Sequence, residues 1–132
     1  MATIEDALTT YLVSLASVAA YVGTDVFHCA PYQLPDTDYI RYQIINPSNE
    51  PYSFVTSDTA QPEIQIDIFS KNDANCLAIG NLIASALNRF TGTLATGINV
   101  IFSTASGPMV MRDASDEQWW HGIVYWNPEY ER

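Results

Sequence analysis

Residues 62–70, PEIQIDIFS, open the stretch of sequence that decides the fold, PEIQIDIFSKNDANCLAIGNLIASALNRF over residues 62–90. Isoleucines at every second position alternate with Glu63, Gln65 and Asp67. This is the period of a strand with one buried face, because successive side chains of a strand point to opposite sides. The stretch therefore predicts a strand over Glu63–Ser70.

A helix is predicted directly after this strand. Asn72 and Asp73 stand where the first turn begins, and an Asx side chain there accepts a hydrogen bond from an unpaired backbone amide. Apolar residues then recur at helical spacing, and Gly92 follows as a stop signal. These apolar residues are Ile79, Leu82, Ile83, Ala86, Leu87 and Phe90. We expect an amphipathic helix over Asp73–Phe90.

The rest of the chain predicts one more helix and several strands. Thr3 can cap an amphipathic helix over Ile4–Tyr21. The predicted strands are Val26–Ala30, Tyr39–Asn46, Ile98–Thr104, the short Met109–Arg112 and Gln118–Trp126, with a turn at Ala105–Pro108 and a strand end at Asn127 and Pro128. This order is typical of an α+β fold, with a mostly antiparallel β-sheet and two helices packed on one face. The 132 residues are the size of a single domain, which we expect to span residues 1–132.

Residues 47–61 form a long polar connection between two predicted strands. Tyr52, Phe54 and Val55 are apolar residues in its middle. Long connections of this kind are often functional or disordered. The segment is expected to be a long hairpin arm or a flexible loop.

The last predicted strand is apolar on both faces. Trp119 and every second residue after it point one way, while Trp120 and its alternates point the other. Helices can cover only one face of a small sheet. The other face is either covered by the long loop or forms a subunit interface, where Trp is enriched.

The charge is strongly negative, with fifteen acids, five bases and a formal net charge of −10. Proteins that grip nucleic acid need clustered Lys and Arg, and here the bases are scattered. The same balance disfavours binding to anionic membranes. The acids could also act only in keeping the protein soluble.

No catalytic motif is found in the sequence. GxSxG, P-loop, GxGxxG and HExxH patterns are absent, and neither histidine stands in a triad-like context. Cys29 and Cys76 are expected to be buried free thiols. We therefore predict a protein that is not an enzyme and that needs no cofactor or metal.

Taken together, these features resemble the tail-terminator proteins of long-tailed bacteriophages, also called tail-completion or head-to-tail joining proteins. The resemblance rests on the N-terminal helix, on VFHCAPYQLPDTDYIRYQII (residues 26–45), on residues 62–88, and on an acidic turn leading into QWWHGIVYW (residues 118–126). It implies a virion protein of the tail or neck, assembled in the host cytoplasm. Such a subunit forms a ring, usually six-fold, that caps the tail tube and meets the head connector or stopper protein. The family's long hairpin loop would correspond to residues 47–61.

On this resemblance, Tyr52, Phe54, Val55, Trp119 and Trp120 are predicted to contact a neighbouring subunit or the tail tube protein. The acids Asp113, Asp116 and Glu117 are predicted to face a channel through which DNA passes without specific binding. Two alternatives remain. The chain could be another neck or tail component, such as a connector adaptor or tube protein, or a small ligand-binding or enzymatic α+β domain.

Overall fold

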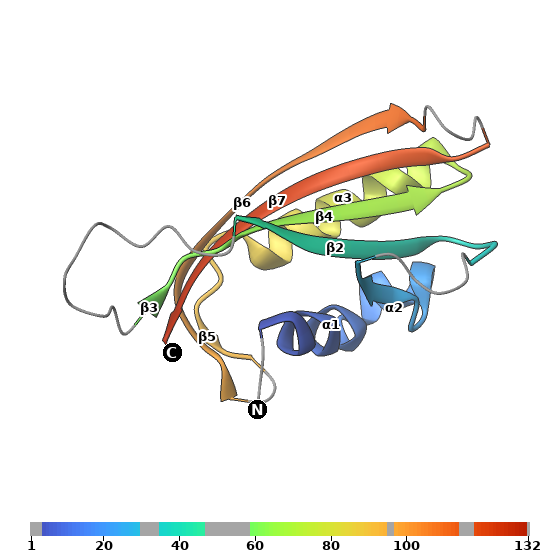
Figure 1. The fold of residues 1–132 in the computed structure, drawn as a ribbon. Coiled ribbons are helices and arrows are strands. Elements are labelled where there is room, and N and C mark those ends of the chain that lie inside the picture. Colours follow the sequence, from blue (N-terminus) through green and yellow to red (C-terminus); the bar gives the residue numbers. More distant parts are fainter. Residues whose placement is uncertain (1–3, 30–34, 47–58, 95–96, 114–117, 132) are drawn as a thin grey trace.

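The structure of the protein is a computed structural model that describes residues 4–29, 35–46, 59–94, 97–113 and 118–131 (Figure 1). Its elements in chain order are α1 (Ile4–Ser14), α2 (Ala16–Val22), β1 (Val26–His28), β2 (Tyr39–Asn46), β3 (Thr59–Ala60), β4 (Glu63–Ser70), α3 (Asp73–Leu87), β5 (Gly92–Thr93), β6 (Asn99–Arg112) and β7 (Trp120–Glu131). The α+β class predicted from the sequence is confirmed.

The strands form one curved sheet in the order β1-β2-β4-β7-β6-β5, and β3 pairs with the end of β7. β1 runs parallel to β2, whereas β2–β4, β4–β7, β6–β7 and β5–β6 are antiparallel. The sheet is therefore mixed, and the prediction of a mostly antiparallel sheet is corrected. The direction of β1 depends on the connection from β1 to β2, which carries no sequence signal for a parallel return.

Three helices, not the predicted two, lie against the sheet within the described residues. The predicted first helix breaks at Leu15, whose φ of −75° and ψ of 105° are extended. Neither Gly nor Pro marks this break, and the hydroxyl of Ser14 donates to the Tyr11 carbonyl at 2.6 Å. The break lets the chain change direction, so that both α1 and α2 contribute side chains to the core.

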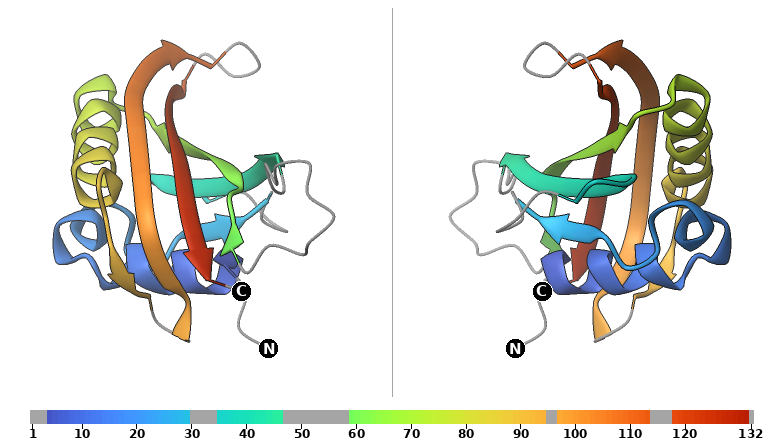
Figure 2. Two further views of the ribbon diagram at one scale, coloured as in Figure 1. Left: turned by 90° about the vertical axis from the view of Figure 1, so that its left-hand side faces the viewer. Right: turned by 90° about the vertical axis from the view of Figure 1, so that its right-hand side faces the viewer.

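The core lies between the sheet and the three helices. Its largest fully buried side chains include Trp126 on β7, Tyr42 on β2 and the alternating isoleucines of β4. Leu8 and Leu12 of α1, with Ile79 and Ile83 of α3, pack into the same cluster. Figure 2 shows α3 on one side of the sheet, with the long strands β6 and β7 curving past it.

α3 begins as the sequence predicts and ends earlier. The Asn72 side chain accepts hydrogen bonds from the amides of Ala74 and Asn75, at 2.9 and 3.4 Å. The helix ends at Leu87 and not at Phe90, because Asn88 is extended and Arg89 has a positive φ of 61°. The Ser103 hydroxyl donates to the carbonyls of Leu87 and Phe90, so β6 satisfies the end of the helix.

β6 and β7 are longer than predicted because two turn signals are overridden. β6 continues through Gly107 and Pro108, where the register against β7 shifts between Ser106 and Met109. A bulge of this kind absorbs an extra residue without ending the ladder. Pro108 packs against Gly80 of α3, where an added Cβ would lie 2.5 Å from the Pro108 Cβ. β7 likewise continues through Asn127 and Pro128, which remain in register with β6.

The outer edge of β6 is covered only in part. β5 pairs with Asn99 and Val100. The Arg89 amide donates to the Ser103 carbonyl at 3.0 Å, and the Ala105 amide donates to the Asn88 side chain at 3.1 Å. Within the described residues, Met109–Arg112 pairs with β7 on one side and with no strand on the other. We call Met109–Arg112 the β6 tip.

Candidate functional site

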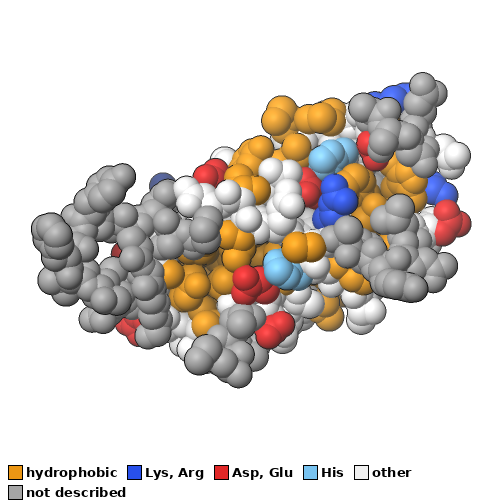
Figure 3. All heavy atoms as spheres, in the orientation of Figure 1, with side chains coloured by type: hydrophobic (Ala, Val, Ile, Leu, Met, Phe, Trp, Pro, Cys, Tyr) orange, Lys and Arg blue, Asp and Glu red, His pale blue; other side chains and the backbone are white. Residues whose placement is uncertain are grey.

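The face of the sheet that points away from the helices carries the most unusual group of side chains. We call it the helix-free face. On β7, Gly122, Val124 and Trp126 are buried in the core, while His121 and its alternates point to this other face. Figure 3 shows hydrophobic side chains on this side of the molecule, next to basic, acidic and histidine side chains. The alternation predicted for the last strand is therefore confirmed.

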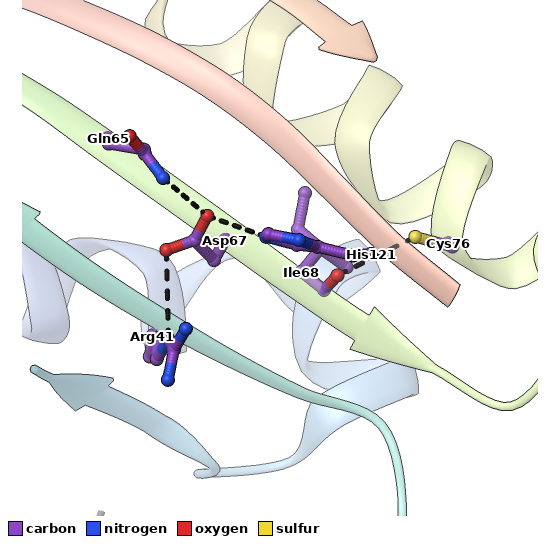
Figure 4. A network of polar contacts seen from close by, with 6 residues as sticks. All are labelled: Arg41, Gln65, Asp67, Ile68, Cys76 and His121. Atoms are coloured by element: carbon purple, nitrogen blue, oxygen red, sulfur yellow. Dashed lines mark hydrogen bonds and ion pairs between the residues drawn. The ribbon is translucent and has the colours of Figure 1, made fainter. Parts of the chain in front are cut away.

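Asp67 on β4 lies at the centre of this face, and its side chain is only 1% exposed. Its carboxylate accepts hydrogen bonds from Gln65 Nε2 at 2.9 Å and from His121 Nε2 at 2.7 Å (Figure 4). Arg41 Nε on β2 lies 3.7 Å from the other carboxylate oxygen. Because an ionised carboxylate only accepts, the Nε2 nitrogen of His121 must carry a proton. Three neighbouring strands thus offset the cost of burying one charge.

Aromatic rings surround this carboxylate. Phe69 stacks between His121, at 4.6 Å between centroids, and Tyr39, at 4.9 Å. Trp119 packs edge-on against Tyr39 at 5.6 Å. The Arg41 guanidinium lies over the Phe69 ring at 4.9 Å, a cation–π contact. Tyr39 and Phe69 are consequently buried, although no helix of the described residues covers them.

Large apolar side chains elsewhere on the strands stay exposed. Ile45 on β2 is 44% exposed, and Met109 and Met111 on β6 are 53% and 40% exposed. Met109 and Met111 are the register partners of Ile123 and His121, so they share the helix-free face. An exposed apolar area with a partly polar border is typical of a surface that binds another protein.

The Asp67–His121 pair resembles part of a catalytic triad, but among the described residues its contacts supply no nucleophile. Within the described part of the chain, Asp67 contacts Gln65, Arg41 and His121, and the His121 ring stacks on Phe69. A nucleophile would need a hydroxyl or thiol in hydrogen-bond contact with the histidine. The geometry instead fixes three strands relative to one another.

The sequence-predicted contact residues fall partly within the described structure. Trp119 is half-buried on the helix-free face, and Lys71 Nζ lies 5.2 Å from the centre of its ring. Trp120 is also half-buried but packs against the core, with the Arg112 guanidinium over its ring at 4.9 Å. Tyr52, Phe54 and Val55 lie outside the described residues.

Of the three predicted channel acids, only Asp113 lies within the described residues. Asp113 follows β6, and its amide donates to the Trp119 carbonyl at 2.9 Å. Asp116 and Glu117 lie outside the described residues. The structure therefore places Asp113 at the end of the β6–β7 hairpin, beside the exposed Arg112.

The two cysteines differ in their surroundings. Cys76 on α3 is buried, and burial raises the pKa of its thiol to about 11. Cys29 is exposed, so the expectation that both thiols are buried is wrong for Cys29. It stands directly after the short edge strand β1, with a positive φ of 63°. Within the described part of the chain, no group of three His, Cys, Asp or Glu side chains could hold a metal ion. Among the same described residues, no helix combines the length and apolarity needed to cross a membrane.

Asp67 and its partners Arg41, Gln65 and His121, which we call the Asp67 cluster, are the feature that sequence reasoning missed. Asp67 appears in the sequence as one polar residue of an alternating strand, and nothing near it signals burial. The available signal was that Arg41 and His121 stand on the outward positions of two other predicted strands. Placing these two residues beside Asp67 would have required knowledge of the strand order.

Comparison with known proteins agrees with this architecture. The family model described as tail completion protein gp17 matches residues 6–126. A chain from the structure described as the virion of a native gene transfer agent particle aligns with a TM-score of 0.72 and 17% identity, over 98% of this chain and 95% of that chain. A second solved chain aligns with a TM-score of 0.54 and 8% identity, over 99% and 97% of the two chains. At these identities the two alignments show the fold alone.

No curated protein sequence matches the chain significantly. The family match, in contrast, extends from α1 into β7 and so includes Asp67, Arg41 and His121. The chain therefore belongs to the tail completion protein gp17 family, and it is a structural component of a phage tail or neck.

Proposed function

We propose that the chain is a ring-forming subunit that closes the tail tube and joins the finished tail to the head. The observation that carries this proposal is the family match over residues 6–126. In this role the protein acts through binding surfaces and not through catalysis. Its partners are further copies of itself, the tail tube protein, and a head connector or stopper protein.

The helix-free face is the surface we assign to these contacts. It exposes Met109 and Met111, and the half-buried Trp119 lies at its aromatic end. Partner burial of such side chains contributes about 25 cal/mol per Å² of apolar area removed from water. The Asp67 cluster keeps the three central strands in a fixed arrangement, which lowers the entropy cost of binding.

The acidic composition fits a ring through which DNA passes. A net charge of −10 on each subunit repels phosphate, and a closed ring concentrates that field in its bore. We assign Asp113, Asp116 and Glu117 to the channel wall. If these acids lie on the outer surface instead, their role is limited to solubility.

The oligomeric state tests the proposal. We expect light scattering or native mass spectrometry to detect a homo-oligomer, most simply a hexamer, for the protein alone or with tail tubes. Negative-stain images should show one closed ring at the tube end. A protein that stays monomeric in both settings would contradict the proposal. Long open stacks would identify a tube protein instead.

The segment containing Tyr52, Phe54 and Val55 offers a second test. We expect replacement of all three by Ser to leave the thermal transition of the subunit unchanged and to reduce ring formation or attachment to tail tubes. A matched control replaces Ser53, Thr56 and Ser57 by Ala, which keeps the apolar residues. Loss of the thermal transition in the triple Ser variant would place these residues in the subunit's own core.

A further inference from the structure

The sheet ends in an unpaired strand at each side. At one end, β1 pairs with β2 only; towards the other end, the β6 tip pairs with β7 only, within the described residues. A row of unpaired backbone amides and carbonyls is a template for pairing with another chain. A molecule with two such edges can pair head to tail with copies of itself.

The β6 tip is distinct from the rest of the β6 edge. Further back along the strand, β5 and the end of α3 satisfy the edge, through the Ser103 carbonyl and the Ala105 amide. The tip has no such cover among the described residues, and it carries the highly exposed Met109 and Met111. Methionine side chains adapt to a partner surface and make favourable contacts with aromatic rings.

β1 offers matching chemistry. Phe27 is the register partner of Arg41, which lies on the helix-free face, and its ring packs edge-on against Tyr39 at 6.5 Å. Phe27 therefore occupies the same face as Met109 and Met111. If a neighbouring copy placed β1 beside the β6 tip, the phenyl ring would meet the methionine side chains.

Strand directions favour this pairing. β1 is parallel to β2, and two antiparallel steps through β4 make β7 parallel to β1 as well. β6 is antiparallel to β7 and so runs opposite to β1. In a ring whose axis runs along the strands, the rotation from one copy to the next leaves strand directions unchanged. The ladder between β6 of one copy and β1 of the next would therefore be antiparallel. It would also keep the helix-free faces of all copies on one side of the ring.

We propose that the β6 tip of one copy pairs antiparallel with β1 of the next copy, so that one continuous sheet runs around the ring. This inference rests on the proposed function, since it names the subunit interface of the ring assigned there. In this arrangement Phe27 lies opposite Met111, and Cys29, two residues further along the chain, comes level with Met109.

The native thiol of Cys29 allows a direct test by cross-linking. It is exposed, whereas the second thiol, Cys76, is buried. We would prepare Met109→Cys and Met111→Cys, which replace exposed side chains, and oxidise each assembled protein. The expected result for at least one variant is a ladder of disulfide-linked multimers on a non-reducing gel. A bond within one molecule is excluded, because β1 and β6 are four strand spacings apart, about 19 Å along the sheet.

The control adds Cys29→Ser to each cysteine variant. The ladder should then disappear, because the cross-link needs one thiol from each edge. Cross-linking that persists without Cys29 would show β6 pairing with β6 across a two-fold axis and would overturn the inference. A closed ring that forms no Cys29-dependent link at either position would also overturn it, while leaving the proposed function intact. A protein that stays monomeric in every setting would overturn both.

Discussion

Asp67 shows how one buried side chain can organise a face that has no hydrophobic cover. Its carboxylate is 1% exposed, yet it contacts Arg41, Gln65 and His121 from three strands. A buried ion pair is weak evidence for stability by itself, since desolvation offsets much of the attraction. Its effect is geometric, because β2, β4 and β7 must keep one register for the contacts with Arg41 and His121 to form.

Tyr42 gives a residue-scale prediction about alkaline stability. Its hydroxyl donates to the Glu5 carbonyl and contacts the Thr9 hydroxyl, which ties α1 to β2. Burial raises the pKa of Tyr42 to about 12, from an ordinary value of 10.0. A raised pKa in the folded state means that stability is fully present below pH 10 and is lost as the pH rises towards 12.

We therefore expect the free energy of unfolding to fall between pH 10 and 12, with a shallower fall in Tyr42→Phe. Near pH 8 this variant should be less stable by about 1 kcal/mol, because a buried hydrogen bond is lost. Urea titrations at each pH measure both effects. Tyr21→Phe removes an exposed hydroxyl and is the control. An unchanged alkaline slope in Tyr42→Phe would contradict the assignment.

At the scale of elements, local signals predicted β2, β4 and the start of α3 because these depend on nearby residues. The isoleucine alternation and the Asx cap act within a few positions along the chain. The wrong predictions concern features that are determined by contacts between residues far apart in the sequence. β6 passes through Gly107 and Pro108 because pairing with β7 and contact with Gly80 compensate for the turn-forming residues. The break at Leu15 and the parallel direction of β1 have no local signal at all.

The same limit applied to the candidate site. Alternation alone placed Trp119 and Trp120 on opposite faces, since it depends on one strand, but it could not say which face the helices cover. Finding Asp67 with Arg41 and His121 required the neighbours of β4, which no single segment specifies. The exposed tip of β6 could not be foreseen either, because the sequence predicted a turn in the middle of that strand.

The cap of α3 gives a prediction at this scale. We expect Asn72→Ala to lower the free energy of unfolding by about 1 kcal/mol and the melting temperature by a few degrees, since two first-turn amides lose an acceptor. Asp73 also accepts from the Ala74 amide at 2.8 Å, so the loss should not exceed this value. Thermal unfolding followed by circular dichroism measures it. Asn72→Asp, which keeps the acceptor, should unfold like the parent, and equal losses in both variants would contradict a capping role.

For the whole molecule, the charge distribution predicts that free DNA is not bound. The net charge is −10, and several bases are already engaged within the chain. Arg41 lies beside Asp67, Lys71 pairs with Asp36 at 2.8 Å, and Arg112 stacks on Trp120. Few cations remain to displace counterions from phosphates.

We expect no shift of duplex DNA in gels at physiological salt, at protein concentrations up to the micromolar range. A known duplex-binding protein serves as the positive control. Salt-sensitive micromolar affinity would contradict the prediction. In a structure of the ring, a bore lined by Arg41, Arg89 or Arg112 would show that the charge argument is wrong.

The contact between the end of α3 and β6 has a consequence for the aggregation of the unassembled subunit. Asn88 and Arg89 occupy the middle of the β6 edge, at Ala105 and Ser103. Helix ends are among the first parts of a protein to fray. Once this turn frays, the open edge extends back to the exposed Ile101 and Phe102 and becomes a long apolar template for irregular aggregation. Heating before assembly should therefore cause irreversible precipitation, and the lifetime of the purified subunit depends on how firmly the last turn of one helix holds.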